Sequence, residues 1–129
     1  MEVVERKRFS INERLRSKRS IEKLFNNGRS FVVYPLRTIY LPISGAEDST
    51  ADFAVLISVP KKRIKGAVQR NKIKRLMREA YRLNKHACTY AGETLHIAFM
   101  YVSNELVTYT MMEKAMQKSL QKIGQSQET

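Results

Sequence analysis

The stretch KKRIKGAVQRNKIKRLMREAYRLNK, residues 61–85, determines how this chain folds and where its function is located. It contains eleven of the 24 Lys and Arg residues of the chain and a single acid, Glu79. In its second half apolar side chains recur at helical spacing, at Ile73, Leu76, Met77, Ala80 and Leu83. This periodicity predicts an amphipathic helix that packs one face against a core.

The same helix carries basic side chains on a different arc. Arg70, Lys74, Arg78 and Arg82 follow at steps of four, with Asn71, Arg75 and Lys85 beside them. A solvated surface is the ordinary interpretation of a charged face, but such a surface usually mixes both signs. Unmixed positive charge repels itself, and a polyanion relieves that repulsion. Arginine also suits bidentate contact with phosphate. We therefore predict a nucleic-acid-binding face, on which Glu79 pairs with one neighbouring arginine.

Length and charge narrow the class of protein. A chain of 129 residues accommodates one domain with a modest core. Its formal net charge of +12 and pI near 10.1 indicate nucleic acid or an anionic membrane surface as partner. Membrane is disfavoured because no apolar run approaches the roughly 20 residues of a spanning helix. Met1–Leu15 does not resemble a signal peptide, and a lone Cys88 fits a reducing cytoplasm.

The remaining pattern predicts two further helices and four strands. The first helix is expected at 18–27, with Ser17 as N-cap and Gly28 as its end. The strands are expected at 30–33, 35–43, 52–59 and 94–102, and the apolar run 52–59 is interpreted as a buried central strand. A capping box at Thr110–Glu113 is expected to open the last helix, which Gly124 is expected to end.

These elements follow in the order α-β-β-β-α-β-α, which predicts an α+β, two-layer sandwich of a four-stranded sheet and three helices. We divide the chain into a basic, mostly irregular segment 1–13, a single nucleic-acid-binding domain 14–124 and a frayed tail 125–129. Met112, Ala115, Met116, Leu120 and Ile123 form the expected buried stripe of the last helix.

No catalytic constellation emerges from the acids, histidines and cysteine. Metal-dependent hydrolysis needs converging carboxylates, whereas the acids here are scattered. Glu47, Asp48 and Asp52 lie in or beside a turn, Glu79 lies among arginines, and Glu113 is expected to cap a helix. His86 and His96 lack the spacing of a metal pair or an acid–base pair. We therefore expect no catalytic residue and no metal ligand in the protein, and a binding subunit is the favoured class.

A family resemblance rests on the basic helix. Residues 67–79, AVQRNKIKRLMRE, resemble the Arg-Asn-Arg signature helix of the bacterial ribonuclease P protein subunit, and Ser58–Lys62 resembles the strand end and double lysine before it. The resemblance covers roughly residues 14–123. Lys72 replaces the usual second arginine, which keeps the charge but not the bidentate fork.

The resemblance implies a fold and a function. The fold is similar to ribosomal protein S5 domain 2-like folds, with a left-handed βαβ crossover where the general rule gives a right-handed one. The function is that of a protein component, without catalytic residues of its own, of an RNA-based endoribonuclease. Such a component binds the catalytic RNA and the 5′ leader of precursor tRNA and assists removal of the leader. Mg²⁺ is then held by the RNA and the substrate phosphates, and the protein is expected to be monomeric and cytoplasmic.

The resemblance also assigns residues. RNA contacts are expected from Arg70, Asn71, Lys72, Lys74, Arg75 and Arg78, and from Lys61, Lys62 and Arg63 before the helix. The leader cleft is expected to include Ile21, Phe25, Arg37 and Ile39, although packing for the apolar residues and solvent exposure for Arg37 remain open alternatives. A structural, ribosomal-type RNA-binding protein remains the alternative function. A DNA-binding regulator is disfavoured because the strand-flanked helix fits neither a helix-turn-helix nor a dimeric basic region.

Overall fold

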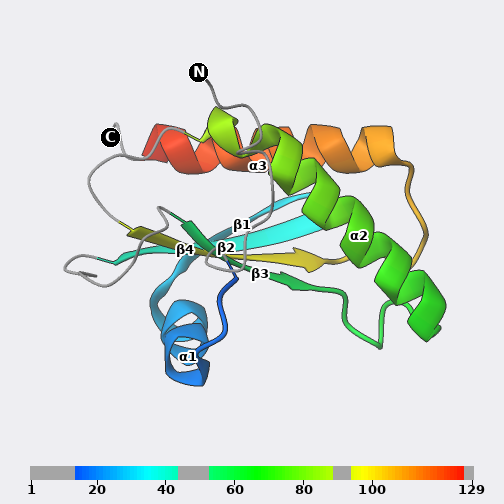
Figure 1. Ribbon diagram of the computed structural model, residues 1–129, viewed down its shortest axis with the longest axis horizontal. Helices are drawn as coiled ribbons and strands as arrows, with labels where there is room; N and C mark the ends of the chain where they lie inside the picture. Colours follow the sequence, from blue (N-terminus) through cyan, green and yellow to red (C-terminus); the bar gives the residue numbers. More distant parts are fainter. Residues whose placement is uncertain (1–13, 44–52, 89–93, 127–129) are drawn as a thin grey trace, which may run out of the picture.

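The computed structural model describes residues 14–43, 53–88 and 94–126 (Figure 1). Its elements are α1 (Lys18–Asn27), β1 (Arg29–Val33), β2 (Leu36–Ile43), β3 (Phe53–Ser58), α2 (Ala67–Asn84), the 3-10 turn η3 (Lys85–Ala87), β4 (Thr94–Tyr101) and α3 (Tyr109–Ser126). Their order confirms the predicted α+β succession. The predicted turn around residues 44–50, most of the 86–93 loop and the segment 1–13 lie outside the described residues.

The strands form one mixed sheet in the order β1-β2-β4-β3. β1 and β4 both pair antiparallel with β2, and β3 pairs parallel with β4. The prediction of a central β3 is therefore wrong, because β4 inserts between β2 and β3. The edge is partly covered by the segment before α1: Arg14 forms a single β-bridge with Val55, and the Leu15 amide donates to the Val55 carbonyl at 2.9 Å. Apolar contacts on both faces of β3 explain why its sequence resembles a central strand.

Helices α2 and α3 cover one face of the sheet and enclose the main core (Figure 1). Ile73, Met77 and Ala80 are buried as predicted, and Tyr81 joins them beside Phe99, with ring centroids 6.0 Å apart. The predicted stripe of α3 is buried throughout, at Met112, Ala115, Met116, Leu120 and Ile123. Because the apolar stripe of α2 is buried in this core, the basic side of α2 faces away from it.

A buried amide joins α2 to α3. Asn84 Nδ2 donates to the Ala80 carbonyl at 2.8 Å and to Glu113 Oε2 at 3.2 Å, and Asn84 Oδ1 accepts from Gln117 Nε2 at 2.9 Å. A buried amide is stable only when its donors and acceptor are paired. These bonds therefore fix the register between the two helices.

Helix α1 lies on the opposite face of the sheet (Figure 1). Leu24 packs there with Leu15, Ile39 and Ala98 in a second, smaller core. Ser17 caps the helix as predicted, accepting a bond from the Ser20 amide at 3.3 Å. Gly28 ends it, also as predicted, but with extended rather than left-handed backbone angles. We call this side of the sheet, with α1, the α1 face.

Both predicted ends of α3 are wrong. Thr108, not Thr110, caps the helix, and its Oγ1 accepts from the Met111 amide at 3.2 Å. Glu113 is consequently two residues too far along for a capping box, whose acid would stand at position 111, and it instead accepts the bond from Asn84. Gly124 is buried inside α3, which continues to Ser126, because packing outweighs a glycine's propensity cost of about 1 kcal/mol. Residues 125 and 126, expected in a frayed tail, are therefore helical, and the rest of that expected tail lies outside the described residues. The hand of the β3-α2-β4 crossover stays a prediction.

Candidate nucleic-acid interface

The basic side of α2 and the loop before it form an open surface. Among the residues expected to contact RNA, the exposed ones are Lys61, Lys62, Asn71, Lys72, Arg75 and Arg78, and the half-buried ones are Arg63, Arg70 and Lys74. The core stripe on the other side of the helix holds this surface outward. The arrangement satisfies the electrostatic requirement for binding a phosphate backbone.

Arg70 has a structural task within this surface. Its Nη1 donates to the backbone carbonyls of Ile64 at 3.0 Å and Lys65 at 2.6 Å. Both acceptors belong to the loop that enters α2, where Gly66 provides no side-chain cap. Arg70 therefore closes the loop onto the first turn of the helix and holds Lys61 and Lys62 near it.

Glu79 pairs with Arg82, as the spacing predicted. Arg82 Nη2 lies 2.5 Å from Glu79 Oε2, and Arg82 Nε donates to Glu79 Oε1 at 3.2 Å. This hydrogen bond raises the pKa of the already cationic guanidinium. The pair lies near the C-terminal end of α2, so the N-terminal part with Arg75 and Arg78 keeps its positive character.

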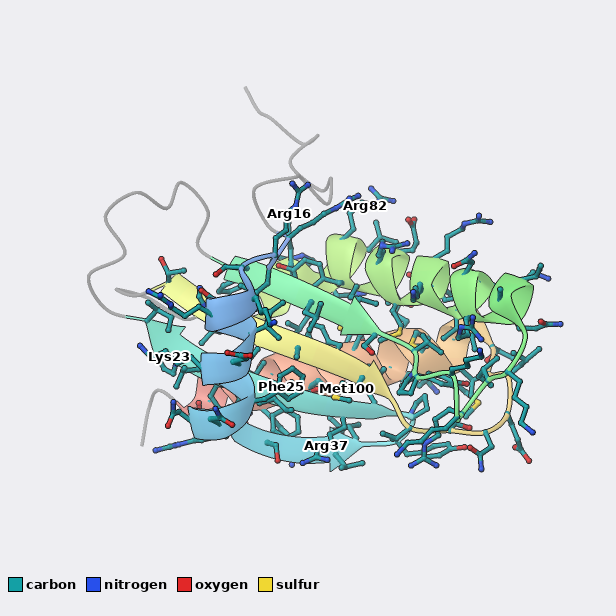
Figure 2. All side chains as sticks on the ribbon, turned by 90° about the horizontal axis from the view of Figure 1, so that it is seen from below. Arg16, Lys23, Phe25, Arg37, Arg82 and Met100 are labelled. Atoms are coloured by element: carbon teal, nitrogen blue, oxygen red, sulfur yellow. The ribbon has the colours of Figure 1, made fainter. Side chains whose placement is uncertain are left out.

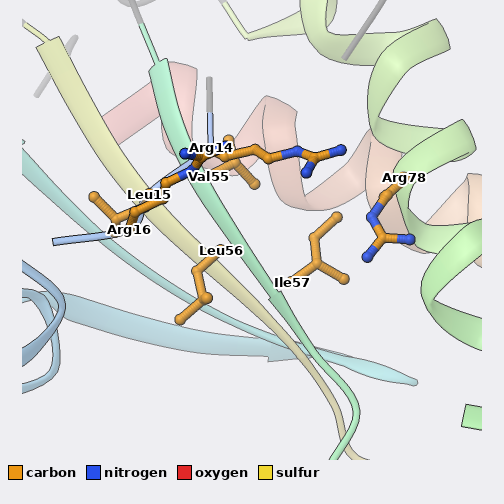
Figure 3. Close-up of a pocket in the computed structure, with 7 residues that line it drawn as sticks. All are labelled: Arg14, Leu15, Arg16, Val55, Leu56, Ile57 and Arg78. Carbon is orange, nitrogen blue, oxygen red and sulfur yellow. The ribbon is translucent and has the colours of Figure 1, made fainter. Parts of the chain in front are cut away.

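A pocket of about 180 Å³ extends the basic surface around the edge of β3 (Figure 3). Its apolar lining comes from Leu15, Val55, Leu56 and Ile57, and its basic lining from Arg14, Arg16 and Arg78. Arg78 reaches it from α2, whereas the other two arginines precede α1. We call it the arginine pocket. The arginine pocket lies between the basic side of α2 and the α1 face, and its three arginines make the surface between them positively charged.

The α1 face holds all four residues expected to contact the leader, but not equally exposed. Phe25 is 41% exposed on α1 and Arg37 is exposed on β2, whereas Ile21 is half-buried. Ile39 is only 5% exposed, because Leu24 packs over it. Phe25 and Arg37, labelled in Figure 2, therefore offer the accessible surface. The two isoleucines belong to the smaller core beneath it.

Neighbouring strands add residues that sequence reasoning missed. Met100 of β4 pairs across the sheet with Arg37 on one side and Ser58 on the other, and Val32 of β1 also pairs with Arg37. Because paired residues in adjacent strands point to one face, this row continues the α1 face beyond α1 (Figure 2). The two-residue alternation of the predicted strand 94–102, which places His96, Ala98 and Met100 on one face, was the sequence signal that could have revealed it.

The described residues supply little acid–base or metal chemistry. Burial lowers the pKa of His96, and Lys23 lowers it further, which favours the neutral imidazole. Within residues 14–43, 53–88 and 94–126, no group of three or more His, Cys, Asp or Glu side chains is placed to hold a metal ion. In the same ranges, no helix has the length and apolarity that crossing a membrane requires.

An outward basic helix on a small α+β sandwich defines the class of nucleic-acid-binding proteins. The family model described as Ribonuclease P matches residues 9–124. The chain is 48% identical over 120 residues to the ribonuclease P protein component of Porphyromonas gingivalis, covering 90% of this chain and 86% of that one. It is 35% identical over 101 residues to that of Chlorobium phaeobacteroides, covering 70% and 69% of the two chains. The chain belongs to the ribonuclease P protein family.

Solved structures with the same fold agree. The RNase P protein from Thermotoga maritima superposes with a TM-score of 0.69 at 24% identity, over 86% of this chain and 97% of that chain. The Staphylococcus aureus RNase P protein gives a TM-score of 0.66 at 21% identity, over 86% and 94%. At these identities the likeness establishes the fold, which is the four-stranded α+β arrangement described above.

Proposed function

We propose that the chain, as the protein subunit of ribonuclease P, binds the catalytic RNA through α2 and the 5′ leader of precursor tRNA through the α1 face. The catalytic RNA hydrolyses the phosphodiester bond that releases the leader. The protein contributes binding energy and position, and no protein side chain acts as a catalytic group.

The observation that carries this proposal is the placement of two different surfaces on one rigid sheet. The basic side of α2 offers exposed Arg75 and Arg78, which suit phosphates of a folded RNA. The α1 face offers a partly exposed aromatic ring at Phe25 and a nearby guanidinium at Arg37, which suit a single strand. A structural RNA-binding protein needs the first surface but not the second.

The arginine pocket connects the two proposed RNA-binding surfaces. A single RNA strand that runs from the basic side of α2 to the α1 face crosses the edge of β3, where Arg14, Arg16 and Arg78 surround apolar side chains. Binding of the uncut leader there favours precursor over mature tRNA, because mature tRNA lacks those nucleotides. Part of this energy can hold the scissile phosphate in place.

Mg²⁺ belongs to the RNA side of this assembly. Magnesium prefers oxygen ligands in a near-octahedral arrangement, and the described residues form no carboxylate cluster of that kind. The described residues therefore do not fit as its holder, although the exposed Asn71 amide can bond to RNA or to a metal-bound water. We further propose that the subunit acts as a cytoplasmic monomer, since a net charge of +12 opposes self-association.

The test is cleavage of a precursor tRNA at low Mg²⁺ by the catalytic RNA, with and without the protein. We expect stimulation, and tighter binding of precursor than of mature tRNA only when the protein is present. The matched control is a precursor with a one-nucleotide leader, which cannot reach the α1 face and should lose the preference. No stimulation, or equal stimulation of binding for precursor and mature tRNA, would contradict the proposal.

A further inference from the structure

A groove of about 500 Å³ lies at the opposite edge of the sheet from the arginine pocket, between the β1–β2 turn and α3. Its residues are Val33, Tyr34, Met111, Lys114, Ala115, Gln117, Lys118 and Gln121. We call it the α3 groove. Neither the basic side of α2 nor the α1 face includes any of these residues, so the groove is a separate surface.

An exposed aromatic ring marks one end of the groove. Tyr34 is 56% exposed, although its hydroxyl lies 2.7 Å from Ser103 Oγ and shares a hydrogen bond with it. This bond holds the ring in one orientation while its surface remains open. Met111, 45% exposed, adds a flexible apolar contact from the first turn of α3. A fixed aromatic surface beside a methionine suits stacking of a planar group.

The helix side of the groove is basic. Lys114 and Lys118 line it at a spacing of four residues and are both exposed. Lys122 continues the row, with its Nζ 5.2 Å from the centre of the Phe31 ring. Four residues of helix rise about 6 Å, which is comparable with the separation of successive phosphates in an extended single strand.

The charged side chains that line the α3 groove are all positive. The described residues that line it include two lysines and no acid. Glu113, the acid next to Lys114, is directed instead toward Asn84 and Tyr109. An anionic occupant is therefore complementary to the groove, and the row of lysines beside a stacking ring matches the combination that binds single-stranded nucleic acid.

We propose that the α3 groove binds an unpaired segment of the same RNA that α2 binds. A base stacks on Tyr34, and Lys114 and Lys118 contact the flanking phosphates. The source follows from the layers of the fold, because α2 and α3 pack together on one face of the sheet, away from the α1 face (Figure 1). The inference rests on the proposed function for the identity of that RNA.

The first experiment measures the groove by itself. Binding of a short fluorescent oligoadenylate to the full chain is followed by anisotropy in a background that carries Arg75→Ala, Arg78→Ala, Phe25→Ala and Arg37→Ala. These four changes weaken both the α2 surface and the α1 face, which is the other surface expected to bind a single strand. Adding Tyr34→Ala should weaken binding by about 5-fold to about 150-fold, the range of one lost base stack of about 1–3 kcal/mol. Tyr34→Phe, which keeps the ring and loses only the bond to Ser103, should stay near the parent. Equal binding by the Tyr34→Ala variant would overturn the proposal.

The lysines are tested by the salt dependence. Lys114→Gln with Lys118→Gln should weaken the oligoadenylate and flatten the slope of log K against log salt by up to about 1.4, at about 0.7 per phosphate contact on a single strand. An unchanged slope would overturn their assignment. Competition by a polyglutamate peptide that is as strong as competition by unlabelled oligoadenylate, and equally dependent on Tyr34, would indicate an acidic protein partner and also overturn the proposal.

The second experiment identifies the source. Hydroxyl-radical footprinting of the catalytic RNA is compared for the unmodified chain and Tyr34→Ala. We expect one unpaired segment to lose protection while the protections that depend on Arg75 remain. An identical footprint would overturn the proposal even if the oligoadenylate binds. Failure of the proposed function would show differently, as full binding of the catalytic RNA by the Arg75→Ala, Arg78→Ala variant.

Discussion

Arg70 Nη1 lies 2.6 Å from the backbone carbonyl oxygen of Lys65, two residues before α2 begins. The same nitrogen also donates to the Ile64 carbonyl at 3.0 Å. The first arginine of the basic row is therefore bound to its own loop, whereas Arg75, one turn and a half further on, is exposed. Residues of one signature thus divide between holding the surface together and presenting charge.

This division predicts different effects of two alanine substitutions. Arg70→Ala should weaken RNA binding and also lower the free energy of unfolding by about 1 kcal/mol, since charged hydrogen bonds at a partly exposed site are lost. Arg75→Ala, the matched control, should weaken RNA binding alone and flatten the salt slope by somewhat under one unit. Urea unfolding and salt-dependent binding of the catalytic RNA measure both. Equal stability of the two variants would contradict a structural task for Arg70.

Substitution of Gly28 should destabilise the protein, because there is no room for a side chain at this position. A Cβ at this position would lie 2.5 Å from the Leu24 carbonyl oxygen, 2.9 Å from Ile39 Cγ2 and 3.0 Å from the Tyr40 carbonyl oxygen. Because two of these atoms are backbone, α1 must shift from β2, and Gly28→Ala should cost about 1–3 kcal/mol of stability. Leader discrimination should fall with it, while binding of the catalytic RNA through α2 should persist.

Gly66→Ala provides the matched control for Gly28→Ala. A Cβ at Gly66 would meet the side chain of Gln69, which is flexible and can turn away. Thermal unfolding of both variants compares the two positions directly. The spatial argument is contradicted if Gly66→Ala is as destabilising as Gly28→Ala.

Phe25 and Leu24 are neighbours in sequence with different predicted effects. Phe25 is 41% exposed, so Phe25→Ala should leave stability nearly unchanged and reduce the preference for precursor over mature tRNA by about 5-fold to about 150-fold. Leu24 is fully buried, so Leu24→Ala should cost about 2–5 kcal/mol of stability. Binding of both tRNA forms to the assembled enzyme is the measurement. An unchanged preference for the Phe25→Ala variant would remove the aromatic contact from the proposal.

Local patterns in the sequence predicted local structure well. The helical spacing of Ile73, Met77 and Ala80 placed the core side of α2, and the charge of residues 61–85 therefore placed its open side. The cap at Ser17 followed from residue type alone. Such features depend on neighbours within one or two turns, which a single sequence displays.

Features that depend on distant segments escaped prediction. An apolar run does not reveal whether β3 is central, because the position of β4 and the cover from Leu15 decide it. The arginine pocket was missed for the same reason, since one β-bridge at Arg14 brings it beside Arg78. Gly124 was misinterpreted because it is buried within α3, which continues to Ser126 in spite of glycine's low helix propensity.

The buried Cys88 thiol should make the free energy of unfolding depend on pH. Burial raises the pKa of its thiol from 9.0 to about 11. The unfolded chain therefore ionises this thiol near pH 9 while the folded chain keeps it protonated, and unfolding releases a proton between these values. The stabilisation is complete below about pH 9 and is lost as pH rises through 11, by about 2.7 kcal/mol in total at 1.36 kcal/mol per pKa unit. The unfolding free energy is measured for the unmodified chain and for a Cys88→Ala variant at each pH, and the second value is subtracted from the first. Lys and Tyr titrate in both chains, so their contributions cancel. The remaining advantage of the unmodified chain should shrink or reverse between pH 9 and 11.

The reactivity of the thiol gives a second measurement. The Cys88 thiol should be modified slowly in the folded chain at pH 8 and quickly in urea, since the thiolate is the reactive form. A pH-independent difference between the two chains would show that the folded thiol ionises as freely as the unfolded one.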